Sequence, residues 1–146
     1  MSALYPHEIL QATIVKGEAK AACSTLSLSI LGFLGGAFIS LGYLAYIHVV
    51  GGMPHEWSGL AVLMGAAVFP IGLICILIGG AELITGNMMV LPAAWLAKKI
   101  SLAALGRNWP SVTLGNLPGA CFVAWFFGHY VGLTAGESLH KTIAVA

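Results

Sequence analysis

Charged side chains are scarce in this sequence, and their scarcity is its first informative property. Only 8% of the 146 residues are Asp, Glu, Lys or Arg, whereas 59% are hydrophobic. Soluble globular domains carry about 25% charged residues, so the composition argues against a water-soluble protein. The sequence also lacks the acidic or basic tracts that are typical of nucleic-acid-binding chains. We therefore expect a chain that lies in a lipid bilayer, with no nucleic-acid partner.

Motifs of enzymes and metal sites are also missing. The three cysteines, Cys23, Cys75 and Cys121, are scattered without CxxC or histidine spacing, which favours packing over a metal or redox role. The sequence contains no phosphate loop, nucleophile elbow or zinc motif. We therefore expect no enzyme activity, no catalytic residue, no cofactor and no metal site.

Long apolar runs, by contrast, are abundant and predict an all-α membrane protein with three transmembrane spans. We expect span one at about residues 27–50 and span three at 109–133. A continuous helix through the apolar run of span two would reach roughly 55 Å, nearly twice the thickness of a bilayer core. Span two is therefore expected to consist of half-helices at 58–78 and 88–98, interrupted by the glycine-rich loop 79–87.

Three segments follow from this pattern. Residues 1–26 are expected to hold a cytoplasmic amphipathic helix over 6–22, residues 27–133 the three-span unit, and residues 134–146 an external polar tail. Five of the six basic residues lie before span one or between spans two and three, and Lys141 is the exception. Because basic residues favour the cytoplasmic side, we expect a multi-pass protein of the inner membrane with a cytoplasmic N-terminus.

The interruption carries polar and flexible residues that are unusual at membrane depth: Gly80, Glu82, Thr85, Gly86 and Asn87. Non-helical backbone persists at that depth only where protein buries it or where it lines a wet cavity. The loop therefore predicts a pore or a transport site. Two interpretations of Glu82 stay open: its carboxylate stabilises the loop by accepting backbone N–H groups, or it contacts a permeant species or a proton directly.

Neighbouring residues extend the candidate site. Thr85 or Asn87 can cap the second half-helix, and the Thr85 hydroxyl can also face a pore. Phe69 and Leu73 lie one helical turn apart and can narrow a pore from one wall, although ordinary packing explains the same spacing. Asn116 in span three is more readily explained as a hydrogen-bond partner of the loop backbone than as a substrate contact.

Together these motifs resemble the formate/nitrite transporter family. The resemblance rests on the acidic-Leu-apolar-Thr-Gly-Asn pattern of residues 82–87 and on the Asn-Trp and Gly-Asn-Leu patterns between residues 108 and 117. It covers nearly the whole chain. It implies an aquaporin-like protomer in a homopentamer, with one pore per protomer. The implied substrates are small monovalent anions of weak acids, such as formate or nitrite, often carried with a proton.

The resemblance also implies residue roles. Phe69 and Leu73 match hydrophobic constriction positions. Thr85 matches a loop threonine that faces the pore, and Glu82 matches the acidic residue that holds the loop.

The resemblance covers only part of the family's fold. Family members have six spans, whereas this sequence matches the first three, so it resembles the N-terminal half of an inverted-repeat fold. The pore histidine of the family belongs to the second half. We therefore expect a half-channel that conducts only with a second half. The alternative is a non-conducting membrane scaffold or assembly subunit of the same fold.

Overall fold

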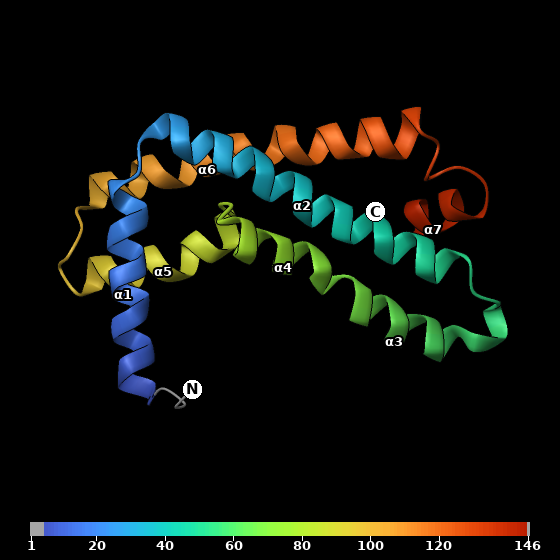
Figure 1. The fold of residues 1–146 in the computed structure, drawn as a ribbon, viewed down its shortest axis with the longest axis horizontal. Helices are drawn as coiled ribbons and strands as arrows, with labels where there is room; N and C mark the ends of the chain where they lie inside the picture. Colours follow the sequence, from blue (N-terminus) through green and yellow to red (C-terminus); the bar gives the residue numbers. More distant parts are fainter. Residues whose placement is uncertain (1–4, 146) are drawn as a thin grey trace.

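The structure is a computed structural model that describes residues 5–145 and contains helices but no strand within that range (Figure 1). Its elements in chain order are α1 (Pro6–Ala22), α2 (Thr25–Gly51), the 3-10 turn η1 (His55–Trp57), α3 (Ser58–Val68), α4 (Pro70–Gly79), α5 (Ile84–Leu96), α6 (Leu102–Val123), the π-helical segment η2 (Ala124–Tyr130) and α7 (Glu137–Val145). Three stretches are long and apolar enough to cross a membrane: Thr25–Gly51, His55–Gly79 and Leu102–Tyr130. The predicted all-α fold with three spans is confirmed.

The spans lie alongside one another, and α1 crosses one end of the bundle (Figure 1). α2 packs most extensively on α6 and also contacts α3 and α4, while α1 packs on α5. The α1–α2 and α5–α6 connections lie at the same end of the molecule, and α7 lies near the opposite end (Figure 1). Most of residues 134–146, which were expected to form a polar tail, belong to α7, and this helix contacts α2.

Glycines allow α2 to approach its neighbours closely. The four-residue spacing of Gly32 and Gly36 in the sequence predicts a small-residue face, and in the structure this face lies against α6. A Cβ atom added at Gly36 would collide with the carbonyl oxygen of Asn116. On the opposite side of the contact, a Cβ atom at Gly119 would collide with the carbonyl oxygen of Phe33. The backbones of α2 and α6 are therefore close enough for a side chain of α6 to reach the backbone of α2.

Two helices begin earlier than the sequence predicted, although α1 has the predicted bounds. α5 begins at Ile84 rather than at residue 88, so Thr85 and Asn87 lie in its first turn and neither caps it. α6 begins at Leu102 rather than at residue 109, and the Ser101 hydroxyl caps it. Arg107 and Asn108, which precede the predicted start of span three, lie inside α6 and hydrogen-bond to the end of α1.

Gly36→Ala should destabilise the bundle, because the new methyl group would collide with the Asn116 carbonyl oxygen. Overpacking of this kind lowers the free energy of unfolding by about 1–3 kcal/mol. Gly106→Ala in α6 is the matched control, since no atom lies within 4 Å of its Cβ position. That substitution should raise stability by about 0.5–1 kcal/mol. Thermal unfolding in detergent measures both variants, and equal effects from the two would contradict the packing described here.

Candidate transport site

The interruption of span two is a short link between α4 and α5. At its start, Gly80 adopts a φ of 65°, a left-handed conformation that glycine reaches without steric cost. The N–H groups of Gly80 and Ala81 both donate to the carbonyl of Ile76, which closes the end of α4. The chain then turns away from the α4 axis and resumes as α5 at Ile84.

Asn116 of α6 holds the backbone of this link. Its Nδ2 donates to the carbonyl of Gly32 at 2.7 Å and to that of Glu82 at 2.8 Å. Its Oδ1 accepts the N–H of Ile84 at 2.9 Å. The N–H of Glu82 donates to the carbonyl of Leu31 at 3.0 Å. One side chain thus joins the link to α2 and supplies the N-terminal cap that the sequence of α5 does not provide.

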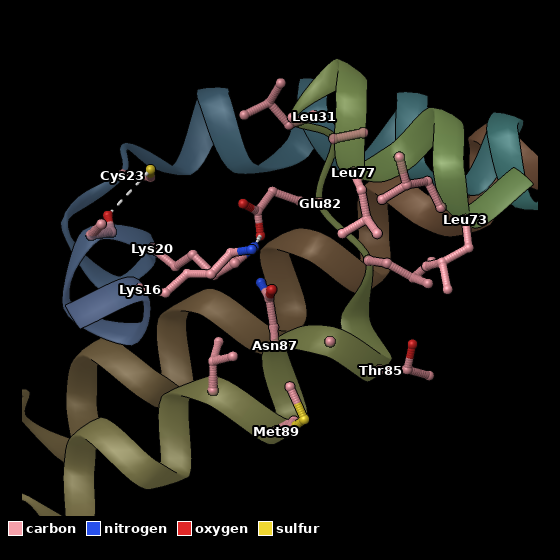
Figure 2. A pocket seen from close by; sticks show the side chains of 17 residues that line it. Lys16, Lys20, Cys23, Leu31, Leu73, Leu77, Glu82, Thr85, Asn87 and Met89 are labelled. Atoms are coloured by element: carbon pink, nitrogen blue, oxygen red, sulfur yellow. Dashed lines mark hydrogen bonds and ion pairs between the residues drawn. The ribbon is translucent and has the colours of Figure 1, made fainter. Parts of the chain in front are cut away.

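The carboxylate of Glu82 pairs with Lys20 in the last turn of α1. Oε2 and Nζ are 2.6 Å apart, and the two side chains are only 7% and 15% exposed (Figure 2). The expectation that backbone N–H groups satisfy this carboxylate is wrong for the described residues, where its hydrogen-bond donor is the lysine. Sequence reasoning missed Lys20 because the two residues are 62 positions apart. The available signal was a buried carboxylate that required a cation.

A second set of hydrogen bonds ties α1 to α5 and α6. Asn108 Nδ2 donates to the carbonyl of Lys20 at 3.2 Å, and Asn87 Nδ2 donates to Asn108 Oδ1 at 2.8 Å. Both asparagines are fully buried. The carbonyl of Lys20 can only accept a hydrogen bond, so Asn108 must direct its NH2 group toward it. The Asn108 oxygen then faces Asn87, which must donate in turn, and the orientation of both amides is fixed. It leaves Asn87 Oδ1 without a partner among the described residues. Arg107 Nη2 adds a bond of 2.6 Å to the carbonyl of Ala21.

A cavity of about 510 Å³ opens beside the ion pair (Figure 2). Six of the predicted site residues line it: Leu73, Gly80, Glu82, Thr85, Gly86 and Asn87. Lys16 and Lys20 of α1 line it as well. The Asn87 side chain points toward the ion pair in Figure 2. The charged residues of this lining are Lys16, Lys20 and Glu82, and their formal charges sum to a net positive value.

Two predicted site residues lie outside the lining of this cavity. Phe69 is at the junction of α3 and α4, where its ring lies edge-on to that of Tyr43 with centroids 6.5 Å apart. Asn116 lies behind the link, where its amide bonds backbone groups. Within residues 5–145, no group of three or more His, Cys, Asp or Glu side chains is placed to hold a metal ion.

The chain combines a broken apolar span, a polar link and a cavity beside it, and its sequence matches the model of the formate/nitrite transporter family over residues 7–146. The chain belongs to this family. The match confirms the family resemblance that the sequence motifs indicated.

Individual family members are similar over nearly the whole chain. The chain is 57% identical over 142 residues to "Uncharacterized transporter YrhG" of Bacillus subtilis (strain 168), covering 97% of this chain and 53% of that protein. It is 49% identical over 141 residues to "Formate channel BtFdhC" of Bacillus thuringiensis, covering 97% of this chain and 54% of that protein. It is 37% identical over 134 residues to a "Probable formate transporter" of Methanothermobacter thermautotrophicus, covering 90% and 49%. The chain therefore spans about half the length of these relatives.

In this chain of the formate/nitrite transporter family, removing one residue of the Lys20–Glu82 pair should lower the free energy of unfolding more than removing both. Lys20→Met leaves a buried carboxylate without a counter-charge and should lower the free energy of unfolding by about 3–5 kcal/mol. Glu82→Gln keeps an acceptor for Lys20 and should cost less. The double variant should be more stable than Lys20→Met alone, since it contains neither charge.

Thermal unfolding of the single and double variants in detergent gives the coupling energy of the pair. Lys16→Met is the control, because Lys16 is an exposed lysine of the same helix and should change stability little. Strictly additive losses in the double variant would contradict a direct interaction between Lys20 and Glu82.

Proposed function

We propose that this chain forms the N-terminal half of a membrane channel or transporter for small monovalent anions of weak acids, such as formate or nitrite. The observation that carries the proposal is the polar link of span two, which Asn116 and Lys20 hold against a cavity. Relatives named as a formate channel and a probable formate transporter support the substrate class. No enzyme activity is part of the proposal.

The charges around the cavity favour an anion over a cation. The ammonium groups of Lys16 and Lys20 exceed the single carboxylate of Glu82, so an approaching anion is attracted electrostatically. The N-terminus of α5 adds partial positive charge beside Thr85. The same cavity therefore suits the first step of anion uptake.

Passage beyond the cavity requires a different form of the substrate. Leu73 and other apolar side chains line the cavity, and an ion loses hydration energy on entering such surroundings. A neutral acid loses much less. We propose that the anion gains a proton near Thr85 from a donor on the second half, the pore histidine that the family resemblance implies. It then passes the hydrophobic constriction formed by Phe69 and Leu73 as the neutral acid.

Orientation and assembly complete the proposal. Basic residues gather at the end of the molecule that contains α1 and the α5–α6 connection, which favours a cytoplasmic N-terminus in the inner membrane. A second half supplies the opposite wall of the pore, and complete protomers form a homopentamer with one pore each. This chain by itself corresponds to half of an aquaporin-like inverted-repeat fold.

A non-conducting scaffold or assembly subunit is the second candidate. The extensive packing of α2 on α6 and the Lys20–Glu82 pair stabilise the fold whether or not anions move, and this is compatible with such a role. Such a subunit would keep the helical packing and the ion pair but would not move anions.

Co-expression with the second half of a full-length family member should give saturable formate flux in reconstituted vesicles, whereas residues 1–146 alone should not. In the assembled pair, Thr85→Val removes the hydroxyl at the cavity and should lower flux about tenfold, the value of one hydrogen bond. Thr113→Val is the matched control, because the Thr113 hydroxyl bonds the Trp109 carbonyl on an exposed face of α6. Radiolabelled formate uptake measures all variants.

Two outcomes would contradict this proposal. Selective flux through residues 1–146 alone would contradict the half-pore. Assembly with a second half but without flux would favour the scaffold.

A further inference from the structure

The turn after α5 contains a lysine in a backbone conformation that favours glycine. Lys98 has a φ of 59°, and within residues 5–145 it is the only residue other than glycine with a positive φ. Its N–H donates to the Trp95 carbonyl at 2.8 Å, and the N–H of Lys99 donates to the Ala94 carbonyl at 2.9 Å. This bond pair commonly closes a helix through a left-handed residue, usually glycine. Lysine is less stable than glycine in this left-handed conformation, and closing the helix does not require a lysine at this position.

The helix dipole explains why a cation lies near the end of α5. It does not explain why the left-handed residue itself is a lysine. A lysine at the C-terminus of α5 stabilises the partial negative charge of the helix, and Lys99 provides that charge without the left-handed conformation. Both lysines are exposed, and neither pairs with a carboxylate in the described part of the chain. The Lys98 ammonium is therefore available to a ligand from outside the molecule.

Large apolar side chains flank the two lysines. Trp95 is 42% exposed, Leu96 73% and Leu102 61%, whereas Leu91 and Ala94 on the packed face of α5 are fully buried. The turn lies at the same end of the molecule as the α1–α2 connection (Figure 1). An indole, two leucines and two ammonium groups thus share one exposed turn at the end of a membrane span.

We propose that the turn formed by Trp95, Leu96, Lys98, Lys99 and Leu102 binds the headgroup of an acidic phospholipid. The ammonium groups complement the lipid phosphate, and the indole and leucines enter the boundary between headgroups and acyl chains. Free phosphate would satisfy the charges but leave the apolar side chains in water, which favours a lipid as the occupant. The site is independent of the proposed anion transport.

Thermal unfolding of the chain in phosphatidylcholine vesicles that contain increasing fractions of phosphatidylglycerol tests this site. Phosphatidylglycerol should stabilise the wild-type chain. In Lys98→Asn, the fraction that gives half of the stabilisation should rise about fivefold, which corresponds to one lysine near an anionic surface. Asparagine tolerates the left-handed conformation, so this variant is expected to fold. Lys98→Arg keeps the charge and should keep the response.

Two further variants separate this site from general surface charge. Lys16→Gln removes a charge from α1, outside the turn, and should reduce the phosphatidylglycerol response much less than Lys98→Asn does. Lys98→Gly should be more stable than the wild type in pure phosphatidylcholine, because the backbone strain is relieved, yet should respond less to phosphatidylglycerol. A gain in stability together with a weaker response to phosphatidylglycerol would support a role of Lys98 in lipid binding.

Three results would overturn the proposal. The first is an equal phosphatidylglycerol response in the wild type and Lys98→Asn. The second is an equal loss of response in Lys16→Gln, which would indicate unspecific attraction by net charge. The third is equal stabilisation of the wild type by inorganic phosphate in phosphatidylcholine vesicles, which would indicate an anion site without lipid specificity.

Discussion

A helix that breaks inside a membrane must have its freed N–H and C=O groups satisfied within the protein, and this requirement organises the fold around the link. Asn116 meets part of it, because its amide bonds both Glu82 and Ile84, while the carbonyls of Ile76 and Leu31 accept other N–H groups of the link. The side chain reaches the link only if α2, α6 and the link lie very close together. Gly35 lies against the carbonyl of Glu82, and Gly36 against that of Asn116, so any larger side chain would separate these segments. Gly35 and Gly36 are thus needed for the close approach that lets Asn116 hold the break in span two.

The charge on the link imposes a second requirement, which makes α1 part of the site. Glu82 is buried at the cavity wall and is neutralised by Lys20, which lies outside the spans. The carbonyls at the end of α1 are in turn bonded by Arg107 and Asn108 of α6. The position of α1 therefore depends on the third span, and the charge of the cavity depends on α1. A substitution in α1 or in α6 that breaks these bonds should therefore also disturb the link.

Properties that depend on local sequence could be predicted. The three spans and the bounds of α1 follow from runs and spacing of apolar residues, and the site of the break follows from the excess length of the second run and its glycines. The small-residue face of span one follows from the spacing of Gly32 and Gly36. Each of these is determined by residues that are neighbours along the chain.

Properties that depend on distant partners could not be predicted. The start of α5 was placed four residues too late because its cap, Asn116, belongs to another span. The predicted start of α6 was too late. Asn108 and its neighbour hydrogen-bond to α1, but the local sequence alone shows them only as polar residues typical of a loop. Glu82 was left without its true partner because Lys20 is far away in the chain. The constriction role of Phe69 and Leu73 stays a prediction.

Hydrogen–deuterium exchange across the link tests most directly whether Asn116 holds the broken span. Asn116→Leu keeps a similar side-chain volume but removes the three hydrogen bonds to Gly32, Glu82 and Ile84. If Asn116 holds the link, the peptide covering residues 80–86 should be protected in the wild type. It should then exchange about tenfold faster, or more, in the variant, while the α6 peptide around Thr113 changes little. Unchanged exchange across residues 80–86 in a folded Asn116→Leu chain would contradict this role.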